Sequence, residues 1–459
     1  MPLLETLAYV IVFFAACFSF AWVLKEKLKA QVFLRIISIV RTKKPLEFFQ
    51  KFSRFHRLFK AFANLGIIIG FGSLGIDYLY GLKLSKPKRI ILFIFSFAAL
   101  SAIMYFIIGR NAANPLVSSN LLPIIFSFGI FGLAGFSMLL LAINAFDVIA
   151  KILTGGKALP GVAPLIPGIQ IPNVPIFVPL HGWLSLLIIL VVHESFHGIL
   201  AAVHKIKLKS SGLVLFGFLP IGAFVEPDEK KFQAEKPVKK LQVLSVGSMS
   251  NLALFAISLG IFLLLFSVLV APFASPQVQV ISVSKTLTVE GVEIPAPAFE
   301  KLKAGDIVLE LNGVKVSSIE QFSALAKQSK VLEFMLLGES GEERFETIEK
   351  ASSGSIGAVF SQPLDESKIN PLSILLVEFF FWLFMLNLFV AIANLLPIEP
   401  FDGGKMVKIL CIPYLGFLKI PEKVVPVLAF PFFHCFLNAF YCNLLRCSSW
   451  KNALLSRKL

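Results

Sequence analysis

The chain has 459 residues, of which 56% are hydrophobic and only 15% are charged, and 48 of them are phenylalanine. Soluble domains carry about a quarter charged residues, so the composition excludes an ordinary soluble protein and predicts a polytopic α-helical membrane protein with about six to eight spans. The net charge is +15, and the basic residues are concentrated beside apolar segments. This distribution is typical of the loops that flank membrane spans, so it argues against a nucleic-acid partner.

Residues 1–150 are predicted to form an amino-terminal membrane region. Glu5 precedes the first apolar run and no small-residue cleavage site follows that run, so we interpret it as a retained span and not as a signal peptide. Apolar length predicts four spans in this region, near 5–24, 62–82, 90–108 and 122–149. The second of them is the weakest, because Asp77 and several glycines interrupt it.

Basic residues are concentrated in a loop at 25–60, which holds eleven lysines and arginines together with six phenylalanines. The positive-inside rule places this loop in the cytoplasm, either as an amphipathic stretch on the anionic leaflet or as a solvated loop. Alternation of the spans would then put the basic residues at 83–89 outside. That conflict disappears if the second and third spans form a hairpin that does not cross the membrane.

A loop at 151–182, rich in proline and glycine, is predicted on the outer side, because its proline density rules out a regular helix. The next apolar span, 183–204, runs inward and begins the first half of a catalytic core at 183–271. It contains His193-Glu194-Ser195-Phe196-His197, an H-E-x-x-H motif. On a helix, both imidazoles share one face and can bind one zinc ion, with the glutamate beside them. Ionisable groups at this depth indicate a functional site.

A β-hairpin is predicted at 211–226, followed by a span at 243–271. The hairpin segment is apolar but too short to span, it is rich in β-branched and aromatic residues, and Pro220 and Gly222 interrupt it. Such a hairpin within the membrane must be covered by protein or line a wet cavity, and its edge could bind an extended substrate by strand addition. An ordinary loop at the membrane surface is the alternative.

Charged residues return at 276–366, which predicts an inserted soluble α+β domain. The pattern predicts strands and one helix, at 278–284, 306–311, 319–328 (the helix), 332–337 and 344–348. The stretch from Leu302 to Val316, with a Gly-Asp turn, a strand and an Asn-Gly turn, resembles a PDZ domain, although the usual carboxylate-binding loop is not visible. The resemblance implies a peptide ligand bound by strand addition.

The second half of the core is predicted at 372–446, with spans at 372–396 and 424–446. Two histidines do not complete a hydrolytic zinc site, which needs a third protein ligand. Asp402 is the best candidate, because prolines and glycines break the chain around it and let an acid point inward. Glu399 competes on chemistry alone. Asp402 could instead cap the amino terminus of the following helix.

Taken together, the chain resembles the site-2 protease family of intramembrane zinc metalloproteases over about 183–446. Three features carry the resemblance: the H-E-x-x-H span, Asn394-x-x-Pro397 leading to Phe-Asp402-Gly403, and the PDZ-like domain between them. Gly247-Ser-Met-Ser-Asn251 is similar to another family motif. The stretch from Gly222 through Ala223 and Phe224 to Glu226 is similar to the family's membrane-reentrant hairpin, which implies substrate binding there.

The resemblance implies that His193, His197 and Asp402 hold one zinc ion and that Glu194 is the general base. Asn394 and Asn251 are candidate donors to the oxyanion or to the substrate backbone; their alternative role is hydrogen bonding between helices. The expected partners are the lipid bilayer, transmembrane protein substrates and a peptide ligand of the PDZ-like domain.

The predicted function is therefore cleavage of transmembrane segments, in the cell membrane if the organism is prokaryotic. The active site would face the cytoplasm, and the PDZ-like domain would lie outside. Two alternatives stay open: a membrane zinc protease of the prenyl-protein-processing type, with a glutamate as its third ligand, and a non-catalytic membrane scaffold.

Overall fold

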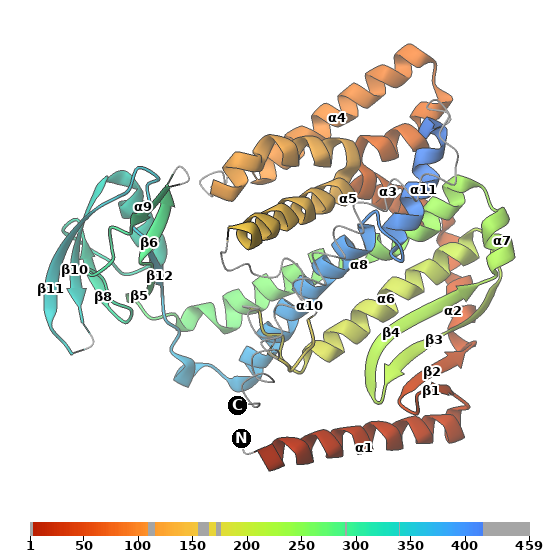
Figure 1. Ribbon diagram of the computed structural model, residues 1–459, viewed down its shortest axis with the longest axis horizontal. Helices are drawn as coiled ribbons and strands as arrows, with labels where there is room; N and C mark the ends of the chain where they lie inside the picture. The colour runs from red at the N-terminus through yellow and green to blue at the C-terminus, as the bar shows by residue number, and fades with distance from the viewer. Residues whose placement is uncertain are drawn as a thin grey trace. The chain divides into compact units, whose positions relative to one another are not determined.

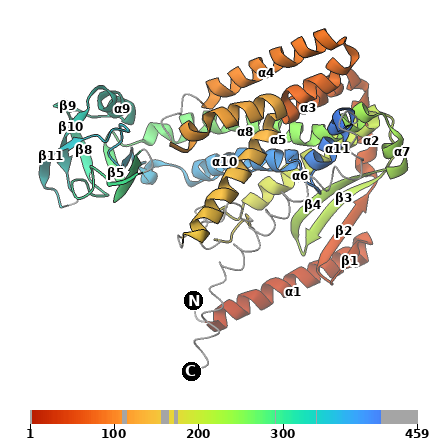
Figure 2. The ribbon, with the colours of Figure 1, turned by 45° about the horizontal axis from the view of Figure 1, so that its top comes forward.

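The computed structural model describes residues 3–108, 115–154, 165–170, 176–289, 292–338 and 340–415. They form two compact units (Figures 1 and 2). The first holds the described residues of 1–110, 120–259 and 381–459, and the second holds those of 111–119 and 260–380.

Within the described residues, six helical stretches are long and apolar enough to cross a membrane, which confirms the prediction of a polytopic helical membrane protein. They are Lys44–Lys83, Lys86–Ile108, Leu121–Leu153, Gly182–Val203, Pro237–Phe273 and Pro371–Leu395. A further helix, α1 (Leu3–Leu28), covers the first predicted span. The span predicted at 424–446 lies outside the described residues.

Two of these stretches, Lys44–Lys83 and Pro237–Phe273, comprise more than one helical element. The first joins short elements to a long one, and its members are α2 (Lys44–Phe52), η1 (Ser53–Phe55), α3 (His56–Leu79) and η2 (Gly81–Lys83). The other α-helices with residues in the first unit are α4 (Lys86–Ile108), α5 (Pro115–Leu153), α6 (Gly182–Val203), α7 (Glu229–Ala234), α8 (Pro237–Leu269), α10 (Pro371–Leu395) and α11 (Asp402–Leu415). Of these, α5, α8 and α10 also have residues in the second unit.

A four-stranded antiparallel sheet flanks α6, and its strands are β1 (Gln31–Phe33), β2 (Ile37–Thr42), β3 (Leu208–Phe216) and β4 (Leu219–Pro227). β3 and β4 form the hairpin predicted at 211–226, and β4 is an outer strand that runs beside α6 in both views (Figures 1 and 2). β1 and β2 come from the basic segment 25–60, for which we had expected an amphipathic stretch or a solvated loop. β2 pairs with β3 from Ile37 opposite Phe216 to Thr42 opposite Ser211.

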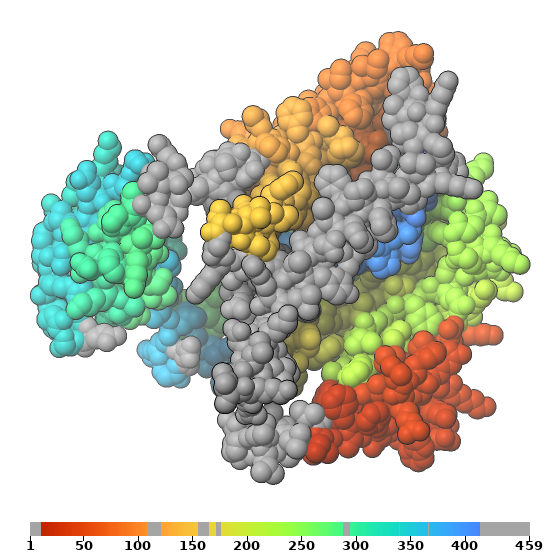
Figure 3. Space-filling view, in the orientation of Figure 1, coloured from red at the N-terminus to blue at the C-terminus, as the bar shows by residue number. Residues whose placement is uncertain are grey.

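The basic segment 25–60 is therefore part of the same unit as α6, the helix that carries the H-E-x-x-H motif. In the space-filling view, its atoms (red) and those of the hairpin (yellow-green) lie side by side on one surface (Figure 3). Phe49 of α2 is 2% exposed, and a Cβ atom on Gly198 of α6 would fall 2.6 Å from its ring. Arg41 of β2 reaches across β3 to Glu226 of β4, with 2.6 Å between Nη1 and Oε2. Glycine at 198 thus lets the basic segment pack closely on α6.

Two membrane helices, α3 and α5, are broken at glycines that touch each other. Gly72 has φ 55° and ψ −138°, and Gly132 has φ 58° and ψ −147°, a conformation that is essentially restricted to glycine. A Cβ atom on Gly72 would fall 2.7 Å from the nitrogen of Gly132, and one on Gly132 would fall 2.4 Å from the oxygen of Ile69. Both breaks occur in the same sequence, Phe-Gly-x-x-Gly. The two helices therefore cross through their unwound turns.

Asp77, which weakened the second predicted span, is 2% exposed and pairs with Arg89 of α4. The guanidinium donates to both carboxylate oxygens, at 2.8 and 3.1 Å from Nε and 2.6 Å from Nη2. A bidentate pair of this kind supplies the partner that a buried carboxylate requires. Arg89, one of the basic residues of 83–89, is thus the charge partner of a buried carboxylate on α3.

The second unit contains a six-stranded sheet, with β9 paired to β8 and the other strands in the order β11-β10-β8-β5-β12. Its elements are β5 (Val278–Val283), β8 (Ile307–Leu311), β9 (Val314–Lys315), α9 (Ile319–Gln328), β10 (Val331–Leu337), β11 (Glu343–Glu349) and β12 (Ala358–Ser361). A separate hairpin comprises β6 (Thr286–Val289) and β7 (Val292–Pro295). Fully buried residues such as Leu311, Phe334 and Ile348 form the core between the six-stranded sheet and α9. All four predicted strands and the predicted helix are present.

Candidate metal centre

Two histidines of α6 face the same point inside the first unit. His193 and His197 are four residues apart, so one turn of helix places them on one face, and their Nε2 atoms are 3.0 Å apart. The side chain of His193 is 8% exposed and that of His197 14%. This is the arrangement that the H-E-x-x-H motif predicts.

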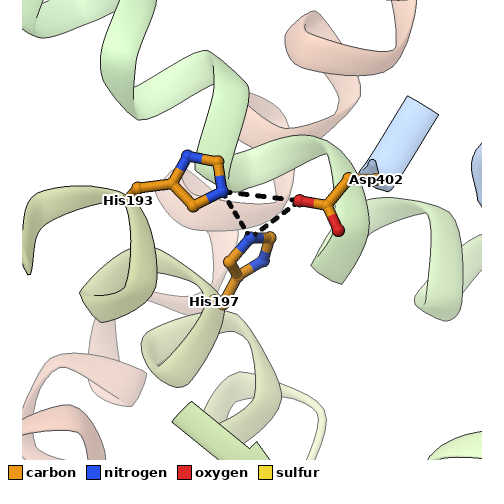
Figure 4. A group of neighbouring side chains, drawn as sticks. All are labelled: His193, His197 and Asp402. Carbon is orange, nitrogen blue, oxygen red and sulfur yellow. Dashed lines mark hydrogen bonds and ion pairs between the residues drawn. The ribbon is translucent and has the colours of Figure 1, made fainter. Parts of the chain in front are cut away.

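Asp402 brings a third oxygen donor to the same point (Figure 4). It is the first residue of α11, and its Oδ2 lies 3.4 Å from Nε2 of His193 and 3.1 Å from Nε2 of His197. Glu399, the competing candidate, instead pairs with Lys408, with 2.6 Å between Oε1 and Nζ. Of the two acids, Asp402 is the one that reaches the histidines.

The two glycines after Asp402 allow this approach. A Cβ atom on Gly403 would fall 2.3 Å from the carbonyl oxygen of Leu395, and one on Gly404 would fall 2.4 Å from the carbonyl carbon of Ile398. The first turn of α11 therefore packs directly on the turn that leaves α10, which only glycine permits. The carboxylate of Asp402 can therefore occupy this position only if the next two residues are glycine.

The three donor atoms fit a tetrahedral zinc ion. Ligands bound to zinc at about 2.0–2.1 Å lie about 3.3 Å from one another, close to the observed 3.0, 3.1 and 3.4 Å. Beside the donors, the backbone of Gly247 in α8 leaves room, because a Cβ atom there would fall 2.4 Å from Nε2 of His197. Two imidazoles and a carboxylate are also the donor types that zinc takes in hydrolytic sites.

The comparison with protein families matches this part of the chain. The profile of Peptidase family M50, the site-2 protease family, aligns with residues 181–415, just over half of the chain, and includes all three donors. The chain belongs to peptidase family M50. It is therefore a member of a family of zinc-dependent membrane metalloproteases.

A relative of this M50 chain is an uncharacterized protein of Methanocaldococcus jannaschii, MJ0971. The two are 31% identical over 276 residues, which is 59% of this chain and 66% of that protein, just under two thirds of its length. The relative carries no assigned activity, so it supports the relationship and adds nothing about the substrate.

Glu194 of the M50 motif lies in the same cavity as the three donors. Its Oε2 accepts a hydrogen bond from the backbone N–H of Val225 in β4, at 2.9 Å. The cavity has a volume of about 560 Å³ and is also lined by Pro227, Asn394 and Asp402. The outer strand of the sheet therefore meets the acid of the motif at the wall of the cavity.

The other predicted site residues of this M50 chain lie in different places. Asn394 lines the cavity, and its amide donates to the carbonyl of Val390 in its own helix at 3.0 Å. Asn251 is fully buried, and its amide lies 3.1 Å from Nδ1 of His193. Of the two roles predicted for Asn251, this position matches hydrogen bonding between helices, since the residue lies behind a histidine of α6.

The three residues predicted to bind substrate, Gly222, Ala223 and Phe224, lie in β4 and are half-buried. The cavity wall itself is formed by Val225 and Pro227, further along the same strand. The sequence did not predict the hydrogen bond from the backbone N–H of Val225 to Glu194, because a backbone donor leaves no mark in the residue type. It also showed Gly247 only as part of a motif, since its closeness to the histidines depends on how α8 packs on α6.

Proposed function

We propose that the protein is a zinc endopeptidase that hydrolyses peptide bonds inside the transmembrane segments of other membrane proteins. The observation that carries this proposal is the convergence of His193, His197 and Asp402, with Glu194 in the same cavity. α6, which holds three of the four, is long and apolar enough to cross a bilayer. A hydrolytic site on such a helix suits a substrate that is itself in the membrane.

The division of roles follows from the positions of the side chains. His193, His197 and Asp402 would hold the ion, which when bound lowers the pKa of a water and polarises the scissile carbonyl. Glu194 would take a proton from the attacking water and pass it to the leaving amine. Its Oε2 is engaged by Val225, which orients the carboxylate and leaves Oε1 for the proton. The second oxygen of Asp402 lies 3.5 Å from Nζ of Lys405.

Asn394 is the candidate donor to the oxyanion. It lines the cavity, and among the described residues only one of its two amide hydrogens has an acceptor, the carbonyl of Val390. The second can be aimed at the negative charge that develops on the carbonyl oxygen of the substrate. Asn251 is not assigned this role, because its amide faces His193.

The substrate segment must be unwound before cleavage, because a transmembrane helix hides its carbonyls in internal hydrogen bonds. The outer strand β4 could hold the unwound segment extended by strand addition. A photo-crosslinking phenylalanine at Phe224 of β4 should capture the substrate. The same probe at Phe33 of β1, the opposite outer strand of the sheet, should not. Equal capture by both probes would contradict this assignment.

We further propose that the α+β fold of the second unit is a PDZ-like module that binds a peptide and restricts which substrates reach the site. The resemblance at 302–316 and the insertion between the two half-sites support this. The basic residues after α6 favour a cytoplasmic active site, with the module outside and the chain in the cell membrane if the organism is prokaryotic. Deletion of 276–366 should abolish the preference for substrates trimmed by an earlier cleavage, and an unchanged preference would contradict the module's role.

A prenyl-protein-processing protease is the second reading of the same motif, and it would need a glutamate as third ligand. The pairing of Glu399 with Lys408 and the contact of Asp402 with both histidines favour the first reading. A non-catalytic scaffold is disfavoured because the motif and the third acid are intact and close together.

The decisive variant is Glu194→Gln, which keeps the shape of the side chain and removes its basicity. We expect it to lose cleavage of a model transmembrane substrate while it binds zinc as the wild type does. Cleavage by the variant at the wild-type rate would contradict the assignment of Glu194 and the proposed mechanism.

A further inference from the structure

One face of α8 lies against both histidines of the candidate metal centre. Val243, Gly247 and Asn251 are each four residues apart, so they stand above one another on that face. The carbonyl oxygen of Val243 lies 2.6 Å from Nδ1 of His197, and the amide of Asn251 lies 3.1 Å from Nδ1 of His193. His193, the first histidine along α6, contacts Asn251, which comes after Val243 in α8. The two helices therefore run antiparallel here.

These two contacts decide which nitrogen of each ring is available to a metal. A histidine that binds zinc is neutral, and the proton on its other nitrogen is donated to a neighbouring acceptor. In both rings the Nε2 atom faces Asp402, so Nδ1 must carry the proton. For His197 the acceptor is the backbone carbonyl of Val243, which no side-chain substitution can remove.

His193 has a side chain in the equivalent place. Asn251 is fully buried, with its amide nitrogen toward the ring and its Oδ1 without a hydrogen-bond partner among the described residues. The oxygen and nitrogen of an amide exchange places by a half turn of the group. That turn puts Oδ1 against Nδ1–H at the same distance, where it accepts a hydrogen bond, and it moves the NH2 group to the place that Oδ1 held.

We propose that Asn251 is a positioning residue that holds His193 as an Nε2 ligand by accepting its Nδ1–H, and that Gly247 keeps the place of the ion open. A Cβ atom on Gly247 would fall 2.4 Å from Nε2 of His197 and 2.6 Å from Nε2 of His193, too close for both nitrogens to stay in place as ligands. The inference rests on the proposed zinc site and adds α8 to it as the element that fixes the ligands.

Zinc affinity of the purified full-length protein, measured by competition with a chelating dye, tests the proposal without reference to activity. Asn251→Leu should weaken zinc binding about 10- to 100-fold, as the loss of such outer partners does. Asn251→Asp, which keeps an acceptor, should bind zinc at least as tightly as the wild type. Asn387→Leu is the matched control: this asparagine is also fully buried, but it donates within its own helix to the carbonyl of Leu383.

Zinc affinities of Asn251→Leu and wild type that agree within a factor of two would overturn the proposal. A lower kcat with unchanged zinc affinity would also overturn it, because that pattern belongs to a donor to the substrate. If Asn251→Leu does not fold, the smaller Asn251→Ala takes its place with the same expectation. A wild type that binds no zinc would refute the proposed function and this inference together, whereas zinc loss in His193→Ala with no effect in Asn251→Leu would refute the inference alone.

Gly247→Ala gives an independent check on the same face of α8. The variant should lose zinc binding, because the added methyl group would press on the Nε2 atoms of both histidines and displace the rings. Gly260→Ala, in the same helix with open space around the added Cβ atom, should bind zinc as the wild type does. Wild-type zinc affinity in a folded Gly247→Ala protein would contradict the role assigned to Gly247.

Discussion

His197 and Asp402 lie 3.1 Å apart, Nε2 to Oδ2, although they come from the two halves of the family-matched region. One is placed by the spacing of a motif on α6 and the other by the glycine-lined first turn of α11. The centre therefore exists only when the two halves are packed together, and its ligands report on both halves.

The identity of the third ligand can be tested with two matched variants. Asp402→Ala should lose zinc binding, because it removes a donor that lies close to both histidines. Glu399→Ala should keep it, since that carboxylate pairs with Lys408. Zinc content is measured by elemental analysis of the purified proteins. Loss of zinc in Glu399→Ala with retention in Asp402→Ala would reverse the assignment.

Removal of the metal should lower stability as well as activity. A ligand that binds only the folded state stabilises it by about 4 kcal/mol at a thousand times its Kd. We expect chelation to lower the unfolding temperature of the wild type, and added zinc to restore it. His197→Ala should unfold at the same temperature with and without zinc. A shift of equal size in that variant would mean that zinc binds elsewhere.

The crossing of α3 and α5 should tolerate no side chain. Gly132→Ala should lower the free energy of unfolding by at least about 2 kcal/mol, because it combines backbone strain with a contact against the oxygen of Ile69. Gly260→Ala, in open space, serves again as the control. Denaturation in detergent measures both. Equal stability of the two variants would show that the crossing yields to a methyl group.

Acid should destabilise the protein through His204, which follows the last residue of α6 and is 6% exposed. Burial, with a smaller effect of the charge on Lys60, lowers the pKa of His204 from 6.5 to about 4. Between these values the unfolded chain binds a proton that the folded chain does not. Stability is therefore complete above pH 6.5 and falls as the pH drops to 4, by up to about 3 kcal/mol.

The measurement is the unfolding temperature as a function of pH. His204→Gln should lose less stability between pH 6.5 and 4.5 than the wild type does. His56→Gln, at an exposed position, should follow the wild type. The groups that also influence His204 are Gln242, Lys239 and Glu235, and all three are unchanged in these variants. Identical pH profiles for His204→Gln and the wild type would contradict the assignment.

Local patterns predicted much of the fold and the centre of the site. Ligand spacing on one helix identified His193 and His197, and the chemistry of the donor set together with the break in the chain identified Asp402. In the second unit, alternation along short segments predicted the strands and the helix at 319–328. These features depend on neighbours in the sequence, which is why they can be read from it.

What depends on packing between distant segments could not be predicted in the same way. Residues 31–42 carry too short a pattern to reveal that β2 pairs with β3. The roles of Gly247 and Val225 follow from a backbone position, and that of Asn251 from its distance to a ring on another helix. The crossing at Gly72 and Gly132 requires two helices to be seen together.

The most direct test of the proposed function is to map where the protein cuts. The purified protein is incubated in detergent with zinc and a substrate that has one transmembrane segment, and the products are identified by mass spectrometry. We expect a cut inside the apolar segment for the wild type and none for Glu194→Gln. Cuts confined to the flanking soluble parts, or the same cut by both proteins, would contradict intramembrane proteolysis at this centre.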